Sequence, residues 1–233
     1  MILFGPPGAG KGTQAKLLRD RLHLTHISTG DMLRRHIEVG DEIGRQSDSV
    51  IKSGKLVSDD VVNQLVRERI AEPGCRNGII LDGYPRTRNQ ARVLLELLKQ
   101  QGLTPAVVHL SVDHERIVAR LSGRLQCPVC GTLYSVITNP PKKPGTCDVE
   151  SAALITREDD SEFAIRQRLE TYEATTQPIL SFFREVGVSV FDVDGADGTP
   201  EQIAERICGL VASSVFGRAT APVRETPVAS VRS

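Results

Sequence analysis

The sequence predicts an α/β protein whose parallel β-sheet is flanked by helices. Short apolar runs bounded by glycine, proline or aspartate alternate along the chain with longer segments of helical periodicity. Strands and helices that take turns in this way indicate right-handed crossovers, and therefore parallel strands. Two long stretches, residues 28–59 and 121–158, interrupt the alternation, and we interpret them as insertions mounted on the sheet.

Four pairs of segments carry the alternation, each an apolar run followed by a periodic one. In chain order they are ILF with KGTQAKLLRDRL, GIILD with TRNQARVLLELLKQ, AVVHLSV with HERIVARL, and VSVFDV with PEQIAERICGLV. A further strand is expected immediately before Ser28. Capping signals locate two helix starts: Thr87 is followed three residues later by Gln90, and Thr199 by a proline and then by Gln202.

The two insertions differ in character. Residues 28–59 have helical periodicity and no strand, whereas residues 121–158 contain three of the five cysteines and no long periodic run. The C-terminal residues 216–233 mix Pro, Ser, Thr, Ala and Arg without periodicity, so we expect them to form a disordered tail. We expect the rest of the chain to form one core, on which the insertions move as two subdomains, from residues 1–27, 60–120 and 159–215.

The balance of charge disfavours several classes of protein. The chain of 233 residues contains 29 Lys and Arg and 29 Asp and Glu, so no net field attracts it to nucleic acid or to an anionic membrane. Aromatic residues that could stack on bases are few, which also disfavours a nucleic-acid-binding module. We find no apolar run long enough to span a bilayer and no signal-peptide pattern. We therefore expect a cytoplasmic protein with neither nucleic acid nor a membrane as a partner.

A glycine-rich loop, GPPGAGKGT, joins the first predicted strand to the first predicted helix. Gly5, Gly10 and Lys11 satisfy the phosphate-loop pattern GxxxxGK[ST], but Gly12 occupies the hydroxyl position and the hydroxyl follows at Thr13. Glycines allow backbone N–H groups to surround an anion, the helix start adds positive dipole, and the lysine adds a point charge. The sequence therefore predicts a P-loop NTPase-like core that binds nucleotide phosphates.

Two polar motifs follow the second and third predicted strands. STGDMLR begins at Ser28 and LDGYPRT at Leu81, so both lie at the carboxyl ends of parallel strands, where open α/β sheets bind ligands. Arginines gather around the second insertion: Arg120 and Arg124 lie four apart on the helix expected to lead into it, and Arg157, Arg166 and Arg168 lie on the way out of it. A set of arginines bordering one phosphate loop indicates phosphate binding rather than a solvated helix face.

These motifs resemble those of the adenylate kinases, specifically the bacterial-type form with a long lid, over residues 1–215. The resemblance rests on GPPGAGKGTQ, ISTGDMLR, GKLVSDD, LDGYPRT with Gln90, SGR, NPPKKPG, and TREDD followed by RQRL and Pro178. It implies a monomeric kinase that catalyses ATP + AMP ⇌ 2 ADP, with residues 28–59 as the AMP-binding subdomain and residues 121–158 as the lid. A GTP-dependent AMP kinase, a relative with the same lid length, is the alternative.

The resemblance also implies the residues of the site. AMP would bind Thr29, Arg34, Lys55, Leu56, Val57, Gly83, Tyr84, Pro85, Arg86, Gln90, Arg157 and Arg168. ATP would bind Gly8, Ala9, Gly10, Lys11, Gly12, Thr13, Arg120 and Arg124. The groups around the transferring phosphoryl would be Lys11, Arg86, Arg120, Arg124, Arg157 and Arg168, with Asp159 and Asp160 organising the arginines. Asp82 would hold waters of a Mg²⁺ ion, which tolerates a mostly aqueous shell and so eases the missing P-loop serine. No general base is implied.

Three cysteines in the second insertion have the spacing of a metal site. Cys127-x2-Cys130-x16-Cys147 is followed, where a fourth cysteine would complete the set, by Glu150. We expect a structural Zn²⁺ here, because a segment of this size gains stability from a metal and because the resembling kinases include zinc-bearing ones. Asp148 competes with Glu150 for the fourth position, and the alternative is that the cysteines only pack. The remaining cysteines, Cys75 and Cys208, and all five histidines are interpreted as structural or surface residues.

Overall fold

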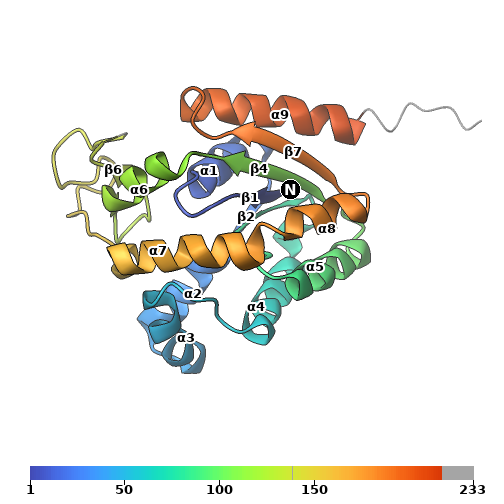
Figure 1. Ribbon diagram of the computed structural model, residues 1–233, viewed down its shortest axis with the longest axis horizontal. Helices are drawn as coiled ribbons and strands as arrows, with labels where there is room; N and C mark the ends of the chain where they lie inside the picture. Colours follow the sequence, from blue (N-terminus) through green and yellow to red (C-terminus); the bar gives the residue numbers. More distant parts are fainter. Residues whose placement is uncertain (138, 217–233) are drawn as a thin grey trace, which may run out of the picture.

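A five-stranded parallel sheet with the strand order β2-β3-β1-β4-β7 forms the centre of the computed structural model, which describes residues 1–137 and 139–216 (Figure 1). Its strands are β1 (Ile2–Phe4), β2 (Thr25–Ser28), β3 (Ile79–Asp82), β4 (Ala106–Ser111) and β7 (Ser189–Asp194). Every pairing between neighbouring strands of this sheet is parallel. The α/β class and the parallel sheet predicted from the alternating pattern are therefore confirmed.

Helices cover both faces of the sheet because successive strand residues point to opposite sides. On one face, Leu3 and Ile80 belong to an apolar cluster with α1 (Lys11–Leu22) and α9 (Pro200–Phe216). On the other face, Ile2 and Leu81 belong to a larger cluster with residues of three helices, α4 (Asp59–Ala71), α5 (Arg88–Gln100) and α8 (Ile179–Glu185). Short η1 (Pro73–Cys75) precedes β3, and α7 (Glu162–Thr171) continues through a π-helical turn, η3 (Tyr172–Thr176), into α8.

Both helix starts predicted from capping signals are confirmed. The hydroxyl of Thr199 accepts a hydrogen bond from the Gln202 amide at 3.3 Å, and the Gln202 side chain accepts one from the Thr199 amide at 2.8 Å. The hydroxyl of Thr87 likewise accepts from the Gln90 amide at 3.1 Å, whereas the Gln90 side-chain oxygen accepts from the Arg86 amide. The motif at Thr87 is thus half of a capping box. The Gln90 side chain bonds the loop before the helix instead of the amide of the capping residue.

Between Ser28, which ends β2, and Asp59, which begins α4, the chain forms two helices and no strand, as the periodicity predicts. α2 (Thr29–Val39) and α3 (Glu42–Lys52) pack against each other beneath the sheet edge (Figure 1). Gly44 permits this contact, because a Cβ atom there would lie 2.0 Å from the carbonyl oxygen of His36. Ser28 and Asp41 cap the two helices by accepting hydrogen bonds from the amides of Asp31 and Gly44.

Residues 121–158 form a small unit at one end of the molecule (Figure 1). It contains the antiparallel strands β5 (Arg124–Gln126) and β6 (Leu133–Ser135) and a small cluster of buried residues, Cys127, Tyr134 and Cys147. The 3-10 turn η2 (Glu158–Asp160) leads out of it. The expectation that Arg124 lies on a helix with Arg120 is wrong. The helix α6 (His114–Ser122) ends at Gly123, whose amide bonds the carbonyl oxygen of Ala119, and Arg124 opens β5.

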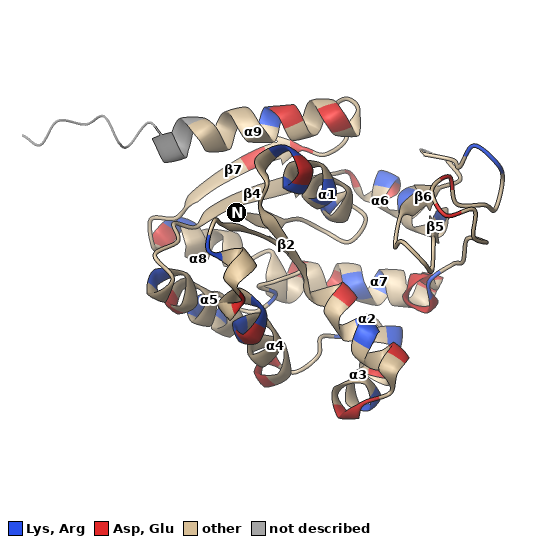
Figure 2. Cartoon of the chain, turned by 180° about the vertical axis from the view of Figure 1, so that it is seen from behind, with Lys and Arg blue, Asp and Glu red and all other residues tan. Residues whose placement is uncertain are grey.

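Acidic and basic residues are interspersed over the helices, while the central strands carry few charges (Figure 2). Within the described ranges, no helix is long and apolar enough to cross a membrane. The tail predicted for residues 216–233 begins inside α9, which extends to Phe216, and its remaining residues lie outside the described part of the chain.

Candidate active site

The phosphate loop connects β1 to α1, and its glycines are required by its shape. Gly5 has φ +145°, and a Cβ atom there would lie 2.5 Å from the carbonyl oxygen of Leu110 on β4. Gly10 caps α1 in the left-handed region with φ 93°. Lys11, the first residue of α1, turns back over the loop and donates hydrogen bonds from Nζ to the carbonyl oxygens of Gly5 at 2.8 Å and Pro6 at 2.9 Å. The ammonium group is thus held beside the loop that would receive phosphates.

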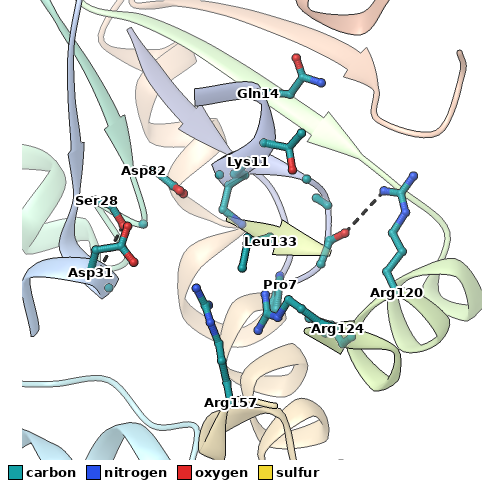
Figure 3. Close-up of a pocket in the computed structure, with 18 of the residues that line it drawn as sticks. Pro7, Lys11, Gln14, Ser28, Asp31, Asp82, Arg120, Arg124, Leu133 and Arg157 are labelled. Carbon is teal, nitrogen blue, oxygen red and sulfur yellow. Dashed lines mark hydrogen bonds between the residues drawn. The ribbon is translucent and has the colours of Figure 1, made fainter. Parts of the chain in front are cut away.

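One open cavity of about 810 Å³ lies at the carboxyl ends of the strands, around this loop. All the residues predicted to bind nucleotide or to act in catalysis line this cavity, except Tyr84 and Pro85. Figure 3 shows Arg124 and Arg157 pointing toward Lys11, with Arg120 reaching the loop from α6. Segments more than 150 residues apart in the sequence therefore converge on one site.

Tyr84 lies in the core rather than in the cavity wall. Its side chain is 1% exposed, and its hydroxyl donates a hydrogen bond to the Asn63 side chain of α4 at 2.6 Å. Pro85 is buried beside it. The neighbouring Gln90 is also buried, but it lines the cavity, and its side-chain nitrogen donates to Asp59 at 2.8 Å. These contacts fix the LDGYPRT loop to α4 and thereby present Gly83 and Arg86 to the cavity.

The loop after β3 is tied to the start of α2. The hydroxyl of Thr29 donates to the carbonyl oxygen of Gly83 at 2.9 Å, and the Nε of Arg86 donates to the same oxygen at 2.8 Å. Burial, and then the nearby Arg168, lower the pKa of Arg86 to about 10. Burial, followed by the neighbouring Arg34, lowers the pKa of Arg157 to about 10. Both guanidinium groups are still charged at neutral pH, so the cavity holds positive charge that water does not fully solvate.

Two buried carboxylates hold the arginines in place. The side chain of Asp160 has 0% exposure and pairs with Arg124, whose Nε lies 2.6 Å away, and with Arg168 at 3.3 Å. Asp159 pairs with Arg168 at 3.2 Å and approaches Arg34 at 4.0 Å. Burial alone would raise the pKa of Asp159, but Arg168 and the other arginines outweigh it and hold this pKa below its ordinary value. The predicted link between Asp159, Asp160 and the arginines matches these contacts.

Lys11 and Asp82 line the cavity beside the phosphate loop (Figure 3). Burial lowers the pKa of Lys11 to about 8, although the carboxylate of Asp82 acts in the opposite direction. Asp82 ends β3 beside the start of α1, since a Cβ atom on Gly12 would lie 3.4 Å from its Oδ2.

His26 was missed by sequence reasoning, which interprets every histidine as structural or surface. Its ring lines the cavity, and its Nε2 lies 3.9 Å from Oδ2 of Asp82. This nitrogen is buried and has no hydrogen-bond partner among the described residues. The position of His26 on β2, two residues before Ser28, is the only signal in the sequence that could have placed it near the site.

Contacts between segments surround the open cavity. Lys16 of α1 donates a hydrogen bond to the carbonyl oxygen of Gly131 at 3.1 Å. Lys52 of α3 pairs with Glu158 of η2 at 2.9 Å. Gly54 lies against α7, because a Cβ atom there would be 2.7 Å from the carbonyl oxygen of Ala164. Residues 28–59 and 121–158 are thus both brought against the rest of the chain around the site.

The three clustered cysteines come together as their spacing predicts. The sulfur atoms of Cys127, Cys130 and Cys147 all lie within 4.8 Å of one another, and those of Cys130 and Cys147 are 3.7 Å apart. Zinc–sulfur bonds of about 2.3 Å in a tetrahedral site place sulfur atoms roughly 3.8 Å apart, so the geometry fits such an ion. Burial opposes ionisation of Cys147, but hydrogen bonds led by the Glu150 amide outweigh it and lower the pKa of Cys147 to about 6.

The carboxylates proposed for the fourth position lie outside this group. Among the described residues, the set of side chains that could hold a metal consists of the three cysteines. Glu150 is exposed but adjacent, since its amide lies 3.5 Å from the Cys147 sulfur. Asp148 accepts a hydrogen bond from the Lys142 amide at 2.9 Å. Of the two remaining cysteines, Cys75 packs in the larger apolar cluster and Cys208 is partly buried.

Comparison with known proteins gives one consistent result. The family model described as "Adenylate kinase" matches residues 3–188. The chain is similar to an adenylate kinase of Anaeromyxobacter dehalogenans strain 2CP-1, with 46% identity over 219 residues, which is 94% of this chain and 99% of the relative. It is also similar to adenylate kinases of Moorella thermoacetica (44% identity; 87% of this chain, 94% of the relative) and Methanococcoides burtonii (44%; 89% and 96%). With the phosphate loop and arginines in one cavity, these matches show that the chain belongs to the adenylate kinase family and is a phosphotransferase that acts on nucleoside monophosphates.

Proposed function

We propose that the protein catalyses the reversible, Mg²⁺-dependent reaction ATP + AMP ⇌ 2 ADP. The convergence of Lys11 and the predicted arginines on one cavity around the phosphate loop is the observation that carries this proposal. Residues of α2, the segment 54–57 and the loop after β3 form one wall, which suits AMP. Residues of α6 and the loop before α9 form the other wall, which suits the donor nucleotide.

The chemistry follows from charge. In-line transfer brings the phosphates of two nucleotides together, and each pair of unit charges about 4 Å apart costs on the order of 4 kcal/mol at an effective dielectric near 20. Lys11 and the buried arginines offset this repulsion, and they act most strongly where water is excluded. The contacts of Lys16 with Gly131 and of Lys52 with Glu158 support such exclusion. Water is then also prevented from accepting the phosphoryl group in place of AMP.

Asp159 and Asp160 position the arginines before substrate binds. Their carboxylates hold Arg124 and Arg168 at the cavity wall, so these guanidinium groups do not have to be ordered when the nucleotides arrive. Proton abstraction from AMP is not required, because its phosphate oxygen is already an anion. We assign no general base.

Asp82 is the group that suits Mg²⁺. A carboxylate is a hard oxygen ligand, and Asp82 lines the cavity beside Lys11 and Gly12 of the phosphate loop. Bound there, Mg²⁺ would neutralise charge on the donor phosphates. Asp82 would hold it through water, and Thr13 would supply the hydroxyl displaced from the usual loop position.

Residues 28–59 are proposed as the AMP-binding subdomain and residues 121–158 as the lid, with residues 1–27, 60–120 and 159–215 as the core. In the lid, Cys127, Cys130 and Cys147 would hold a structural Zn²⁺, with Glu150 as the fourth ligand. The amide of Glu150 lies 3.5 Å from the Cys147 sulfur, which places this residue next to the three cysteines. We also propose that the protein is a cytoplasmic monomer whose partners are ATP, AMP and ADP.

A donor panel tests the reaction. Purified protein is assayed for ADP formation from AMP with ATP or with GTP, and the Lys11→Met variant serves as the control. Transfer from ATP should dominate, and Lys11→Met should lower kcat by about 100-fold or more because a buried positive charge is lost. Strong use of GTP with poor use of ATP would instead establish a GTP:AMP phosphotransferase. Absence of transfer from either donor to AMP would refute the proposal.

Elemental analysis tests the metal. One zinc per chain is expected, and Cys127→Ser should lose it. Glu150→Gln should weaken zinc binding, whereas Asp148→Asn, the matched control, should leave it unchanged. The reverse order of the two carboxylate variants would assign the fourth position to Asp148.

A further inference from the structure

The sulfur atoms of the cysteine cluster are close enough to react with one another as well as to hold a metal. The sulfur atoms of Cys130 and Cys147 are 3.7 Å apart, and the two thiols differ in access: Cys130 is partly exposed, whereas Cys147 is 2% exposed. The third member, Cys127, is fully buried. An exposed sulfur beside a buried one is the arrangement found in thiol pairs that oxidants link.

The geometry allows the link. A disulfide requires the two sulfur atoms to approach to about 2.05 Å, so this pair, 3.7 Å apart, must close by less than 2 Å. The two residues lie on different turns, since Cys130 follows β5 and Cys147 precedes the segment that returns to β5. The bond would therefore cross-link the lid rather than close a local loop.

The two sulfurs differ in their surroundings. The Sγ of Cys147 is buried and lies 3.5 Å from the Glu150 amide and 3.5 Å from the Tyr134 hydroxyl. The sulfur of Cys130 donates to the Thr132 hydroxyl at 3.1 Å and faces solvent in part. A peroxide therefore reaches Cys130 first, and Cys147 is the neighbouring thiol that can close the bond.

We propose that Cys130 and Cys147 form a site of reversible oxidation by peroxide, in which the two are joined as a disulfide and Cys127 stays reduced. The Cys130 sulfur attacks the peroxide, which breaks the O–O bond, gives the sulfenic acid and releases water. The Cys147 sulfur then attacks the Cys130 sulfur, forms the S–S bond and releases the second water. Two thiols are oxidised, one peroxide is reduced to two waters, and a cellular thiol reverses the bond by exchange.

Oxidation would act on the lid at two points. It removes two of the three thiolates from the zinc site, so the zinc would leave as Zn²⁺. This effect rests on the zinc site of the proposed function. It also alters the turn that contains Gly131, whose carbonyl oxygen accepts the hydrogen bond from Lys16 of α1. The oxidised lid would therefore lose a contact with the core beside the phosphate loop.

Peptide mapping without reduction tests the pairing. The full-length protein is treated with hydrogen peroxide, digested and analysed by mass spectrometry, while a chelating dye follows zinc release. We expect one Cys130–Cys147 disulfide, loss of one zinc per disulfide formed, and recovery of free thiols and rebound zinc with dithiothreitol. Zinc content before oxidation tests the metal proposal, and the mapped pairing tests this one, so the two can fail independently.

Variants sharpen the result. Cys130→Ser should abolish the disulfide, and Cys208→Ser, a partly buried cysteine outside the cluster, should leave it unchanged. A disulfide that includes Cys127 would overturn the assignment. So would peroxide treatment that oxidises free glutathione but leaves the wild-type lid thiols intact, whether or not zinc is present.

Discussion

Raising the pH above 8 should remove the charge of Lys11 before it affects the arginines of the site. Burial lowers the pKa of Lys11 to about 8, whereas the pKa values of Arg86 and Arg157 are lowered only to about 10. Burial raises the pKa of Tyr172 to about 12. Between pH 8 and pH 10, Lys11 is thus the group at the phosphate loop that should lose a proton.

The size of the effect follows from this value. With a pKa of about 8, Lys11 is about 90% charged at pH 7 and about 10% charged at pH 9, so kcat/KM should fall by about tenfold between these pH values. Bound phosphates favour the charged ammonium and raise its pKa, so kcat should change much less over the same range. The floor at high pH should approach the activity of Lys11→Met.

Steady-state kinetics between pH 7 and pH 10 with saturating AMP and varied ATP test this prediction. Lys16→Gln is the matched control, because it removes a lysine of the same cavity that points to Gly131 instead, and it should preserve the break near pH 8. Lys11→Met should abolish the break. A wild-type kcat/KM that stays flat to pH 9.5 would refute the inference that burial of Lys11 controls its ionisation.

Three further predictions concern stability. Lys11→Met should raise the free energy of unfolding at pH 7 by about 3 kcal/mol, because a buried charge is removed. The folded pKa of Lys11 lies below its ordinary value of 10.5, so the unfolded chain binds more protons between about pH 8 and 10.5. The wild-type free energy of unfolding therefore rises from about pH 8 to 10.5, and the stability advantage of Lys11→Met over the wild type shrinks. Urea titrations of both proteins at pH 7 and pH 10 check this. The same difference in free energy of unfolding at both pH values would contradict it. Asp160→Asn should cost about 3–5 kcal/mol in chemical denaturation, since Arg124 loses its fully buried carboxylate partner and Arg168 loses one of two. Glu162→Gln at an exposed ion pair should cost less than about 0.5 kcal/mol. Equal losses would argue against burial as the cause. Thr199→Ala should lower the free energy of unfolding by about 1 kcal/mol, because α9 loses its N-terminal cap. Thr199→Ser keeps the hydroxyl and should be close to wild type. A similar loss for both variants would assign the effect to packing.

Much of the site could be predicted from local sequence. The first helix was predicted at residues 11–22 and lies at Lys11–Leu22, because a glycine loop marks its start and its periodicity marks its length. The arginines were predicted to converge on the phosphate loop, since motifs at the ends of parallel strands share one edge of the sheet. The order of strands, loops and helices along the chain was thus enough to predict where most of the site residues lie.

The parts that were not predicted depend on contacts between distant residues. Periodicity ran through Gly123 and suggested a longer helix, although the glycine ends α6 and Arg124 starts a strand of only three residues. Tyr84 lies within a nucleotide-binding motif, yet its partner Asn63 on α4 draws it into the core. The environment of His26 depends on Asp82 of another strand. None of these outcomes can be derived from the neighbouring letters of the sequence.

The ion pairs of Asp160 impose a condition on how this enzyme can evolve or be recombined. Arg124 lies inside the segment 121–158, whereas Asp160 and Arg168 lie beyond its end. Exchanging that segment with one from a relative would separate Arg124 from Asp160, the carboxylate with which it pairs. In related sequences the three positions should therefore change as a group or not at all, and a functional chimera should place its second junction after residue 168 rather than at the visible end of the insertion.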